Sequence, residues 1–377
     1  MPWSRIRPEL DEPDLLHAPA AGVRWLSHAE AIREALDQAM EIDERVLVMG
    51  QGVDDPGGTF GATLDLHRRH GRHRVFDTPL AETALTGVAV GAAIGGVRPV
   101  YLHNRPDFLL LAMDQLVNHA SKWSYMFGGA VHVPLVVWAC IGRGWGSGAQ
   151  HSQALQGLFM HVPGLKLVMP STAHDAKGLM LSAIADDNPV LIIEHRHNFR
   201  HRGPVPEAAY RVPIGKGVVR RPGRHATVVA SSHMATEACL AAQELGAGGI
   251  ETEVVDLRTL RPLDEQIVLD SLARTGRLVV ADTGWRTGGV AAEIGALVAE
   301  KGLHLLRCPI RRVACPDLPT PAGHSLEQAY YPGQAEIVQA VCELVGHVDL
   351  PQSRERPRAR RSSDPDLRQA PPAVVPQ

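Results

Sequence analysis

One glutamate stands at the start of a stretch of small apolar residues. Glu82 opens the segment ETALTGVAVGAAIGG, and no other acidic residue lies between Asp77 and Asp107. Apolar surroundings raise the pKa of a carboxyl group, so Glu82 is suited to hold or pass a proton at neutral pH. The alternative is a glutamate that complements the dipole at a helix amino terminus. The residue types alone leave both interpretations open.

A histidine follows a glycine-rich loop. The loop IGRGWGSGA has glycine at alternate positions from Gly142 to Gly148, and Gln150, His151, Ser152 and Gln153 come next. Glycine lets a backbone lie close to a ligand, and histidine suits proton transfer. The loop has neither the G-K-[ST] ending of a P-loop nor dinucleotide-site spacing. With 19 histidines in the chain, any one of them is more often structural, and the position after the glycine-rich loop makes His151 a candidate to face a ligand.

Two further polar clusters interrupt apolar sequence. His103, Arg105 and Asp107 lie at a strand-to-helix junction, where α/β proteins bind ligands, or form a solvated loop capped by Asp107. The basic run from His195 to Arg202 fits an anionic substrate or, more simply, a solvated interdomain stretch. The chain has no serine-hydrolase, kinase or zinc-enzyme signature.

The elements that must position these residues alternate between apolar strands and helical patterns, which indicates parallel α/β layers. Ser27 and Glu30 form a capping box for a helix to about residue 40, and Thr78 and Pro79 are expected to cap and open the helix that contains Glu82. Another helix is expected over 108–126, with strands at 45–50, 74–79, 134–140, 165–170 and 189–195.

A second α/β domain is predicted after a Pro-, Gly- and Arg-rich segment. Its strands are expected at 226–231, 251–257, 277–283 and 304–310, and its helices near 233–246, 264–274, 288–301 and 332–346. The whole chain then divides into an extended arm (1–22), a first domain (23–196), a linker (197–215), a second domain (216–347) and a disordered basic tail (348–377).

Composition excludes several classes of protein. The chain has 377 residues, 45% of them hydrophobic, and a net charge of -3, so we expect two globular domains and no nucleic acid partner. No uncharged apolar run is long enough to span a membrane. The five cysteines form no C-x-x-C pair, which favours free thiols and a cytoplasmic protein.

Four long strings carry a family resemblance when they are taken together. They are DTPLAETALTGVAVGAAIGGVRPV, FLLLAMDQLVNHASKW, AQHSQALQGLFMHVPGLKLVMPSTAHDAKGLMLSAIADDNPV and DLRTLRPLD. In this order they resemble the beta subunits of the thiamine-diphosphate-dependent 2-oxo acid dehydrogenases of the pyruvate and branched-chain type, within the transketolase superfamily. The resemblance covers residues 24–345 and implies a transketolase-like pyrimidine-binding domain followed by a transketolase C-terminal domain.

The resemblance assigns roles to several residues. Glu82 matches the glutamate that hydrogen-bonds the aminopyrimidine of the cofactor and assists deprotonation of its thiazolium carbon. Leu80 and Phe108 match cofactor-binding positions, with the Phe108 ring stacked on the pyrimidine. His151 matches a histidine that orients substrate in the active-site channel. Four further residues match positions whose oxygens hold a structural monovalent cation such as K⁺: Leu135, Ala183, Asp186 and Asn188.

The resemblance also implies that this chain holds half of a site. The superfamily binds Mg²⁺ and the diphosphate through G-D-G followed by an asparagine, and this chain contains no G-D-G. These ligands are therefore expected from an alpha subunit in an α2β2 heterotetramer. A lipoyl acyltransferase is the further partner that the family implies.

The segment before Phe108 departs from the family pattern. Where the common dehydrogenases have an acidic residue and aromatics, this chain has Leu102, His103, Asn104, Arg105 and Pro106. His103 and Arg105 are therefore expected to make the substrate pocket more polar and cationic. Two alternatives to decarboxylation with acyl transfer remain open at this point: a transketolase-like carboligase half that acts on a sugar or aldehyde, and a non-catalytic partner-binding subunit.

Overall fold

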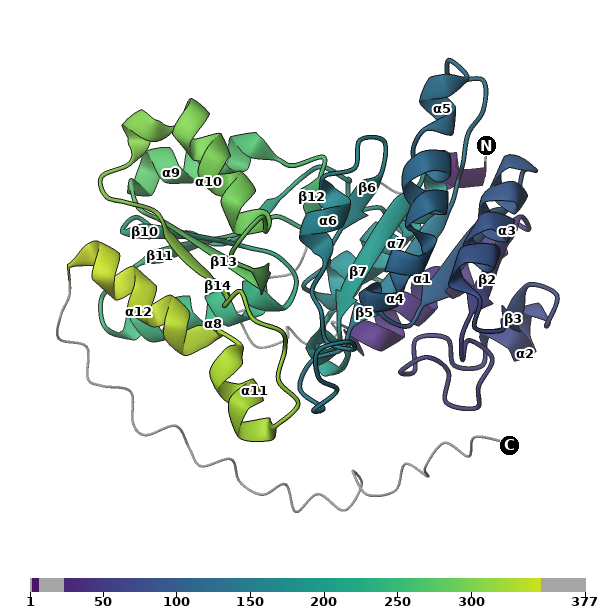
Figure 1. Ribbon diagram of the computed structural model, residues 1–377, viewed down its shortest axis with the longest axis horizontal. Coiled ribbons are helices and arrows are strands. Elements are labelled where there is room, and N and C mark those ends of the chain that lie inside the picture. Colours follow the sequence, from purple (N-terminus) through teal and green to yellow (C-terminus); the bar gives the residue numbers. More distant parts are fainter. Residues whose placement is uncertain (1, 7–23, 347–377) are drawn as a thin grey trace.

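The structure is a computed structural model, and it describes residues 2–6 and 24–346. Two α/β domains lie side by side, with the first half of the chain in one and most of the second half in the other (Figure 1). The predicted tail 348–377 and most of the predicted arm 1–22 lie outside the described residues. The short η1 helix (Pro2–Arg5) places Trp3 against Asp43, whose Oδ2 accepts from the indole Nε1 at 3.0 Å.

The first domain is built on a seven-stranded sheet. Its order is β12-β6-β7-β5-β4-β2-β3, and every neighbouring pair is parallel except β12 with β6. The strands are β2 (Val46–Gly50), β3 (Val75–Asp77), β4 (Arg98–His103), β5 (Val136–Ile141), β6 (Lys166–Val168), β7 (Val190–His195) and β12 (Thr259–Arg261). Buried on both faces, the strands are almost uniformly apolar, as parallel sheets require.

Helices cover both faces of this sheet. On one face lie α1 (His28–Ile42) and α7 (Ala173–Ala185), and on the other α3 (Glu82–Ile94), the η3 turn (Gln115–Ala120) and α6 (Gln156–Met160). The Ser27 capping box is confirmed, because Ser27 Oγ accepts from the Glu30 amide at 3.2 Å and the Glu30 carboxylate accepts from the Ser27 amide at 2.6 Å.

The expected start of α3 is wrong. The helix begins at Glu82 after Ala81, and neither Thr78 nor Pro79 belongs to it. Thr78 continues the path of β3, and its amide donates to the carbonyl of Gly50 at the end of β2 at 3.0 Å. This bond to the sheet competes with a first helical turn, so Glu82 becomes the first helical residue.

The helix expected over 108–126 is broken. It consists of α4 (Pro106–Leu109), η2 (Leu110–Ala112), η3 and α5 (Trp123–Met126). A separate short helix, α2 (Leu66–His70), lies earlier in the domain. One break is the π-helical turn η3, at whose end the Ser121 amide donates to the Leu116 carbonyl, five residues earlier, at 3.1 Å.

The second domain has a five-stranded sheet in the order β14-β13-β10-β11-β9, with only β9 antiparallel to its neighbour. The strands are β9 (Val218–Arg221), β10 (Ala226–Ala230), β11 (Thr252–Asp256), β13 (Leu278–Trp285) and β14 (Arg311–Cys315). Helices α8 (His233–Ala247) and α12 (Gln334–Val345) cover one face, and α9 (Glu265–Thr275) and α10 (Val290–Lys301) the other (Figure 1).

The strand expected at 304–310 is wrong, because the last strand is β14, which pairs with β13 through Val313 opposite Ala281. Residues 303–305 form the short η5 helix (Leu303–Leu305), and Pro309 has no amide hydrogen for a ladder. The sequence patterns also missed the α11 helix (His324–Tyr330) and the strands β9 and β12.

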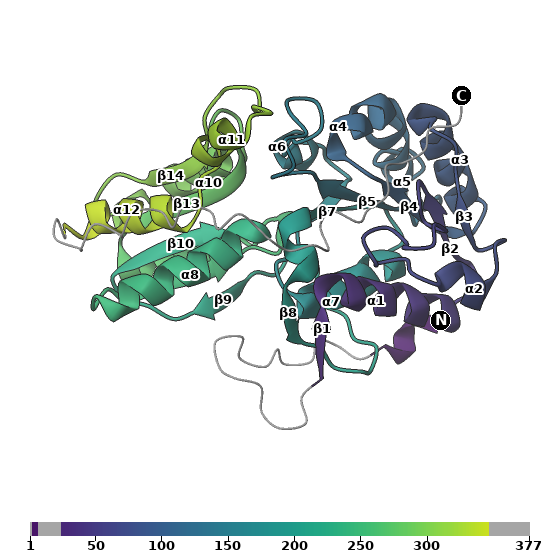
Figure 2. The ribbon, with the colours of Figure 1, turned by 90° about the horizontal axis from the view of Figure 1, so that it is seen from below.

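The segment between the two domains packs on the first domain. Strand β8 (Arg202–Pro204) pairs antiparallel with β1 (Trp25–Ser27), after the short η4 helix (Arg196–Arg200), and lies near α1 and α7 in Figure 2. Beyond it, the Tyr210 hydroxyl donates to the His174 carbonyl at 2.8 Å. Across residues 2–6 and 24–346, no helix is both long and apolar enough to cross a membrane.

Candidate active site

The candidate site lies where the strand order of the first sheet reverses. Strand β2 has β3 on one side and β4 on the other, so the loops that follow β2 and β4 leave the sheet at its topological switch point. The two strand ends lie very close together, since a Cβ on Gly50 would stand 2.5 Å from the Leu102 carbonyl oxygen. Ligands of open α/β sheets bind in this position.

Glu82 is brought to this edge as the first residue of α3. Its side chain is partly buried, and the turn that it opens is tied to η2, because Thr83 Oγ1 donates to the Leu111 carbonyl at 2.6 Å. The carboxylate also lies close to Tyr101 on β4. Burial, reinforced by the negative charge of Glu82, raises the pKa of Tyr101 to about 12.

Arg105, Phe108 and His151 meet beside this edge. The Nη1 atom of Arg105 donates to the His151 carbonyl at 2.8 Å, and the Phe108 and His151 rings make an edge-to-face pair with centroids 5.2 Å apart. Gly142 makes room for this contact, because a Cβ there would stand 2.6 Å from the His151 carbonyl oxygen. The glycine-rich loop thus permits the approach of the strand end to His151.

Asp107 and Gln153 lock the same two segments together. Asp107 Oδ1 accepts from the Gln153 amide at 3.1 Å and from its Nε2 at 2.9 Å. Asp107 is 5% exposed, and burial raises the pKa of its carboxyl group. Asp107 was a candidate from the sequence, but its pairing with Gln153 was not predicted. The two residues are far apart in the chain, so no sequence spacing indicates the contact.

His103 points away from this group. It is 3% exposed, its Nε2 lies 3.2 Å from Thr86 Oγ1 on α3, and its ring packs against Tyr101 with centroids 4.3 Å apart. Burial lowers the pKa of His103 to about 4, so the ring is neutral at pH 7. The structure therefore separates the two residues expected to line a cationic pocket.

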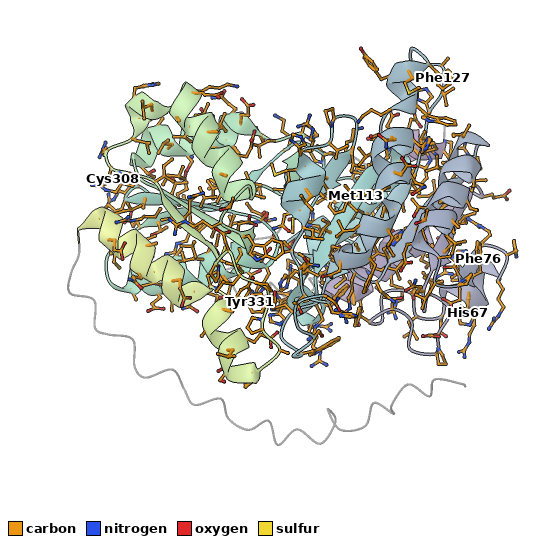
Figure 3. The ribbon with its side chains drawn as sticks, viewed as in Figure 1. His67, Phe76, Met113, Phe127, Cys308 and Tyr331 are labelled. Atoms are coloured by element: carbon orange, nitrogen blue, oxygen red, sulfur yellow. The ribbon has the colours of Figure 1, made fainter. Side chains whose placement is uncertain are left out.

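An apolar surface borders the site. Leu80 is 77% exposed just before α3, and Leu111 and Val88 are 56% and 59% exposed. The tip of α5, which precedes the amino end of β5, also exposes Tyr125, Met126 and Phe127, and Phe127 projects from the first domain in Figure 3. Exposed apolar side chains of this kind are typical of a subunit interface.

The second domain holds the glycine-rich loop in place. The amides of Gly144 and Gly146 donate to the two carboxylate oxygens of Glu327 on α11 at 2.8 and 3.4 Å. Arg143, the residue before Gly144, lies over the ring of Tyr331 at 4.1 Å, and Tyr331 lies at the junction of the domains in Figure 3. No local pattern indicated α11, so Glu327 was missed.

Comparisons with known proteins agree with this arrangement. Residues 25–202 match the transketolase pyrimidine-binding domain, and residues 215–337 match the transketolase C-terminal domain. The chain is 42% identical over 339 residues to an acetoin:2,6-dichlorophenolindophenol oxidoreductase subunit beta from Bacillus subtilis, covering 87% of this chain and 99% of that protein. The chain belongs to the 2-oxo acid dehydrogenase beta-subunit family. The family and fold expected from the sequence are confirmed.

Other members of this family are nearly as similar. A 2-oxoisovalerate dehydrogenase subunit beta from Bacillus subtilis is 38% identical, over 85% of this chain and 98% of its own. A pyruvate dehydrogenase E1 component subunit beta from Rickettsia felis is 39% identical, over 83% and 96%. A solved structure described as a split gene transketolase, inactive beta4 tetramer, shares the fold with a TM-score of 0.68 and 24% identity, covering 85% of this chain and 99% of that one.

The side chains of this beta subunit fit one half of the cofactor that the family implies, thiamine diphosphate. The Glu82 carboxylate lies at the start of α3, whose first turn is tied to η2, and the Phe108 ring pairs with the His151 imidazole. Asp107 Oδ2 and Ser152 Oγ, next to this pair in the chain, are buried without a partner. These groups suit a heteroaromatic ring. The diphosphate and its metal have no matching motif on this chain, which lacks G-D-G.

The four residues expected at a monovalent cation also lie together, beside the turn that follows α7. They are Leu135, Ala183, Asp186 and Asn188. The side-chain oxygen Oδ1 of Asn188 is buried without a partner, and the backbone amide of Asn188 donates to Asp186 Oδ1 at 2.9 Å. The other Asp186 oxygen pairs with Lys166. Oxygen donors of this kind suit a hard cation.

Proposed function

We propose that this beta subunit supplies the aminopyrimidine half of a thiamine diphosphate site in an enzyme that cleaves a 2-oxo acid or a related 2-hydroxy ketone and transfers the acyl group. The observation that supports the proposal is the pairing of Phe108 with His151 beside the sheet edge at which Glu82 opens α3, at the switch point of the first sheet. The names of the relatives suggest pyruvate, 2-oxoisovalerate and acetoin as candidate substrates.

Each of these residues has a separate task. When bound, thiamine diphosphate supplies a nucleophilic carbon and an electron sink for cleavage of the bond next to a carbonyl. Glu82 holds a proton at a ring nitrogen of the aminopyrimidine, Phe108 stacks on the ring, and His151 binds and orients the substrate carbonyl. Arg105 and Asp107 fix the backbone that carries His151.

We propose an alpha subunit as the obligate partner, in an α2β2 heterotetramer. The exposed apolar surface formed by Leu80, Val88 and Leu111 borders Glu82, so a partner that covers it would also close the site. The partner would bring the ligands for Mg²⁺ and the diphosphate, and K⁺ would bind near Asn188. A lipoyl acyltransferase is the proposed acyl acceptor, and free cysteines support a cytoplasmic location.

The carboligase alternative loses its structural argument. It depended on a pocket made cationic by His103 and Arg105, but His103 is buried behind α3 and Arg105 Nη1 is bonded to the His151 carbonyl. The non-catalytic alternative is disfavoured because the chain retains Glu82, Phe108 and His151 together.

The proposal is tested by co-expressing the chain with a partner subunit that contains G-D-G followed by asparagine. Reduction of 2,6-dichlorophenolindophenol is measured with pyruvate, 2-oxoisovalerate and acetoin, each with thiamine diphosphate and Mg²⁺. We expect turnover of at least one substrate and a loss of about 10²- to 10⁴-fold in Glu82→Gln. Glu265→Gln, at an exposed first-turn glutamate of α9, is the matched control. Equal turnover in both variants would refute the role of Glu82.

A further inference from the structure

Three histidines from both domains form a cluster that the proposed reaction does not use. His195 ends β7, His197 lies in η4, and His233 is the first residue of α8. One ring nitrogen from each lies within 4.8 Å of the others. The His195 and His233 rings are stacked with centroids 4.5 Å apart, and the His197 ring stands nearly perpendicular to both, at 5.2 and 5.1 Å.

The cluster contains buried nitrogen atoms that have no partner. His195 is fully buried and His233 is 5% exposed, while His197 is partly exposed. His195 Nε2 and His233 Nδ1 are both buried without a hydrogen-bond partner. Buried polar atoms usually have a hydrogen-bond partner, so these two nitrogens are candidates for contact with a bound ligand.

A carboxylate lies next to one ring nitrogen of His233. His233 Nε2 lies 3.4 Å from Glu237 Oε1, one turn further along α8. A nearby carboxylate favours the proton on Nε2, which would leave the lone pair on the unpartnered Nδ1. A histidine that donates to a carboxylate through one nitrogen and ligates through the other is the usual arrangement around protein-bound zinc.

We propose that His195, His197 and His233 form a binding site for a divalent transition-metal ion of the zinc type at the junction of the two domains. Imidazole nitrogen suits zinc, copper and nickel, and three protein ligands leave one position of a tetrahedral ion open. Zinc–nitrogen bonds of about 2.0–2.1 Å place ligand atoms about 3.4 Å apart, so the stacked His195 and His233 rings must rotate out of their parallel arrangement for their nitrogens to converge on one ion. This inference does not depend on the proposed function.

A negative charge lies beside the three rings. The Glu237 carboxylate is next to His233 and would offset part of the charge of a bound cation. Because η4 and α8 belong to different domains, a bound ion would link them.

The sequence spacing hid this site. His195 and His197 form an H-x-H pair, but the third histidine lies far along the chain after β10, at a spacing that fits no zinc signature. Only the packing of the second domain against η4 brings it near. Asn198 supports this contact by donating from Nδ2 to Ser232 Oγ at 3.3 Å.

The test uses the full chain without an affinity tag, after dialysis against a chelator. Co²⁺ is titrated at pH 7 while visible absorption is recorded, Zn²⁺ is then added in competition, and bound metal per chain is counted by elemental analysis. We expect one ion per chain with the intense d–d bands of a tetrahedral site. We expect His233→Ala and His197→Ala to lose the site, and Glu237→Gln to weaken it by about 10- to 100-fold.

The matched control is His201→Ala. The His201 ring lies 6.3 Å from that of His233 but is outside the set of three, so this variant should bind as the wild type does. Zn²⁺ should also raise the melting temperature of wild type and His201→Ala but not of His233→Ala. Absence of binding to wild type, or equal binding to all variants, would overturn the proposal. If His233→Ala fails to fold, Glu237→Gln and His197→Ala decide.

Discussion

Arg105 is bonded to the backbone of the proposed catalytic histidine, with Nη1 2.8 Å from the His151 carbonyl oxygen. From its place in the sequence, this guanidinium was expected to line a polar, cationic substrate pocket and so to help select the substrate. Its position instead supports a role in holding His151 against Phe108. The two roles predict different effects on a panel of substrates.

Replacing Arg105 by alanine should reduce kcat/KM for pyruvate, 2-oxoisovalerate and acetoin by a similar factor. A hydrogen bond from a charged donor contributes roughly 1.5–3 kcal/mol, which corresponds to a loss of about 10- to 150-fold. Steady-state kinetics of the assembled enzyme measure this, with Arg68→Ala on the exposed surface of α2 as the control. A loss confined to one substrate would restore the substrate-selecting role.

His103 should make stability depend on pH. Its pKa is lowered from 6.5 to about 4 by burial, so the unfolded chain takes up a proton at a higher pH than the folded chain does. The stability from neutral His103 is complete above pH 6.5 and is lost as the pH falls toward 4. At about 1.4 kcal/mol per pKa unit, the full loss is about 3 kcal/mol.

Urea unfolding of wild type and His103→Gln between pH 7 and pH 4.5 checks this expectation. The stability advantage of wild type should shrink as the pH falls. Thr86→Val is the control, because it removes the hydroxyl beside His103 Nε2 and keeps the titrating ring, so it should retain the pH slope of wild type. Parallel curves for wild type and His103→Gln would contradict the assignment.

Glu327→Ala should loosen the glycine-rich loop without unfolding the chain. The variant removes the acceptor of the Gly144 and Gly146 amides, and the loop leads directly to His151. We expect faster hydrogen exchange over 142–148 and a decrease in kcat of about tenfold, the effect of about 1.4 kcal/mol on the barrier. Gln328→Ala, exposed on the same helix, should change neither quantity.

Val88→Asp should block assembly with the alpha subunit. Val88 is 59% exposed on the face of α3 that carries Ala84, Gly87 and Gly91, so a carboxylate there costs the isolated chain little. It would be buried without a partner in an interface. Analytical ultracentrifugation of the mixed subunits measures the outcome, and Leu240→Asp on α8, 43% exposed, is the control. Normal heterotetramers of Val88→Asp would place the interface elsewhere.

Local signals predicted the elements whose ends are set by neighbouring residues. Ser27 and Glu30 sit three residues apart and cap α1 as expected. The start of α3 and the last strand were wrong because the sheet decides them: the Thr78 amide bonds to Gly50, and β14 pairs with β13 beyond Pro309.

In the candidate site, too, residues that stand out locally were predicted, whereas contacts between distant segments were not. Glu82 and His151 were singled out by residue type and position, and Phe108 because it stands in a long family motif. The Asp107–Gln153 pair, the Glu327 contact to the loop and the three-histidine cluster join segments distant in sequence. No periodicity or spacing encodes such contacts, and only the packed structure places them.

Strand β12 makes the first domain dependent on the second half of the chain. It closes the open edge of β6, with Thr259 opposite Val168 and the Met169 amide bonded to the Arg258 carbonyl at 2.8 Å. During synthesis on the ribosome, β6 keeps an unpaired edge until residues 258–261 have emerged. A fragment that ends near residue 215 would expose this edge to strand pairing with other chains and would tend to aggregate. The first domain therefore completes its sheet only after part of the second half of the chain has been synthesised.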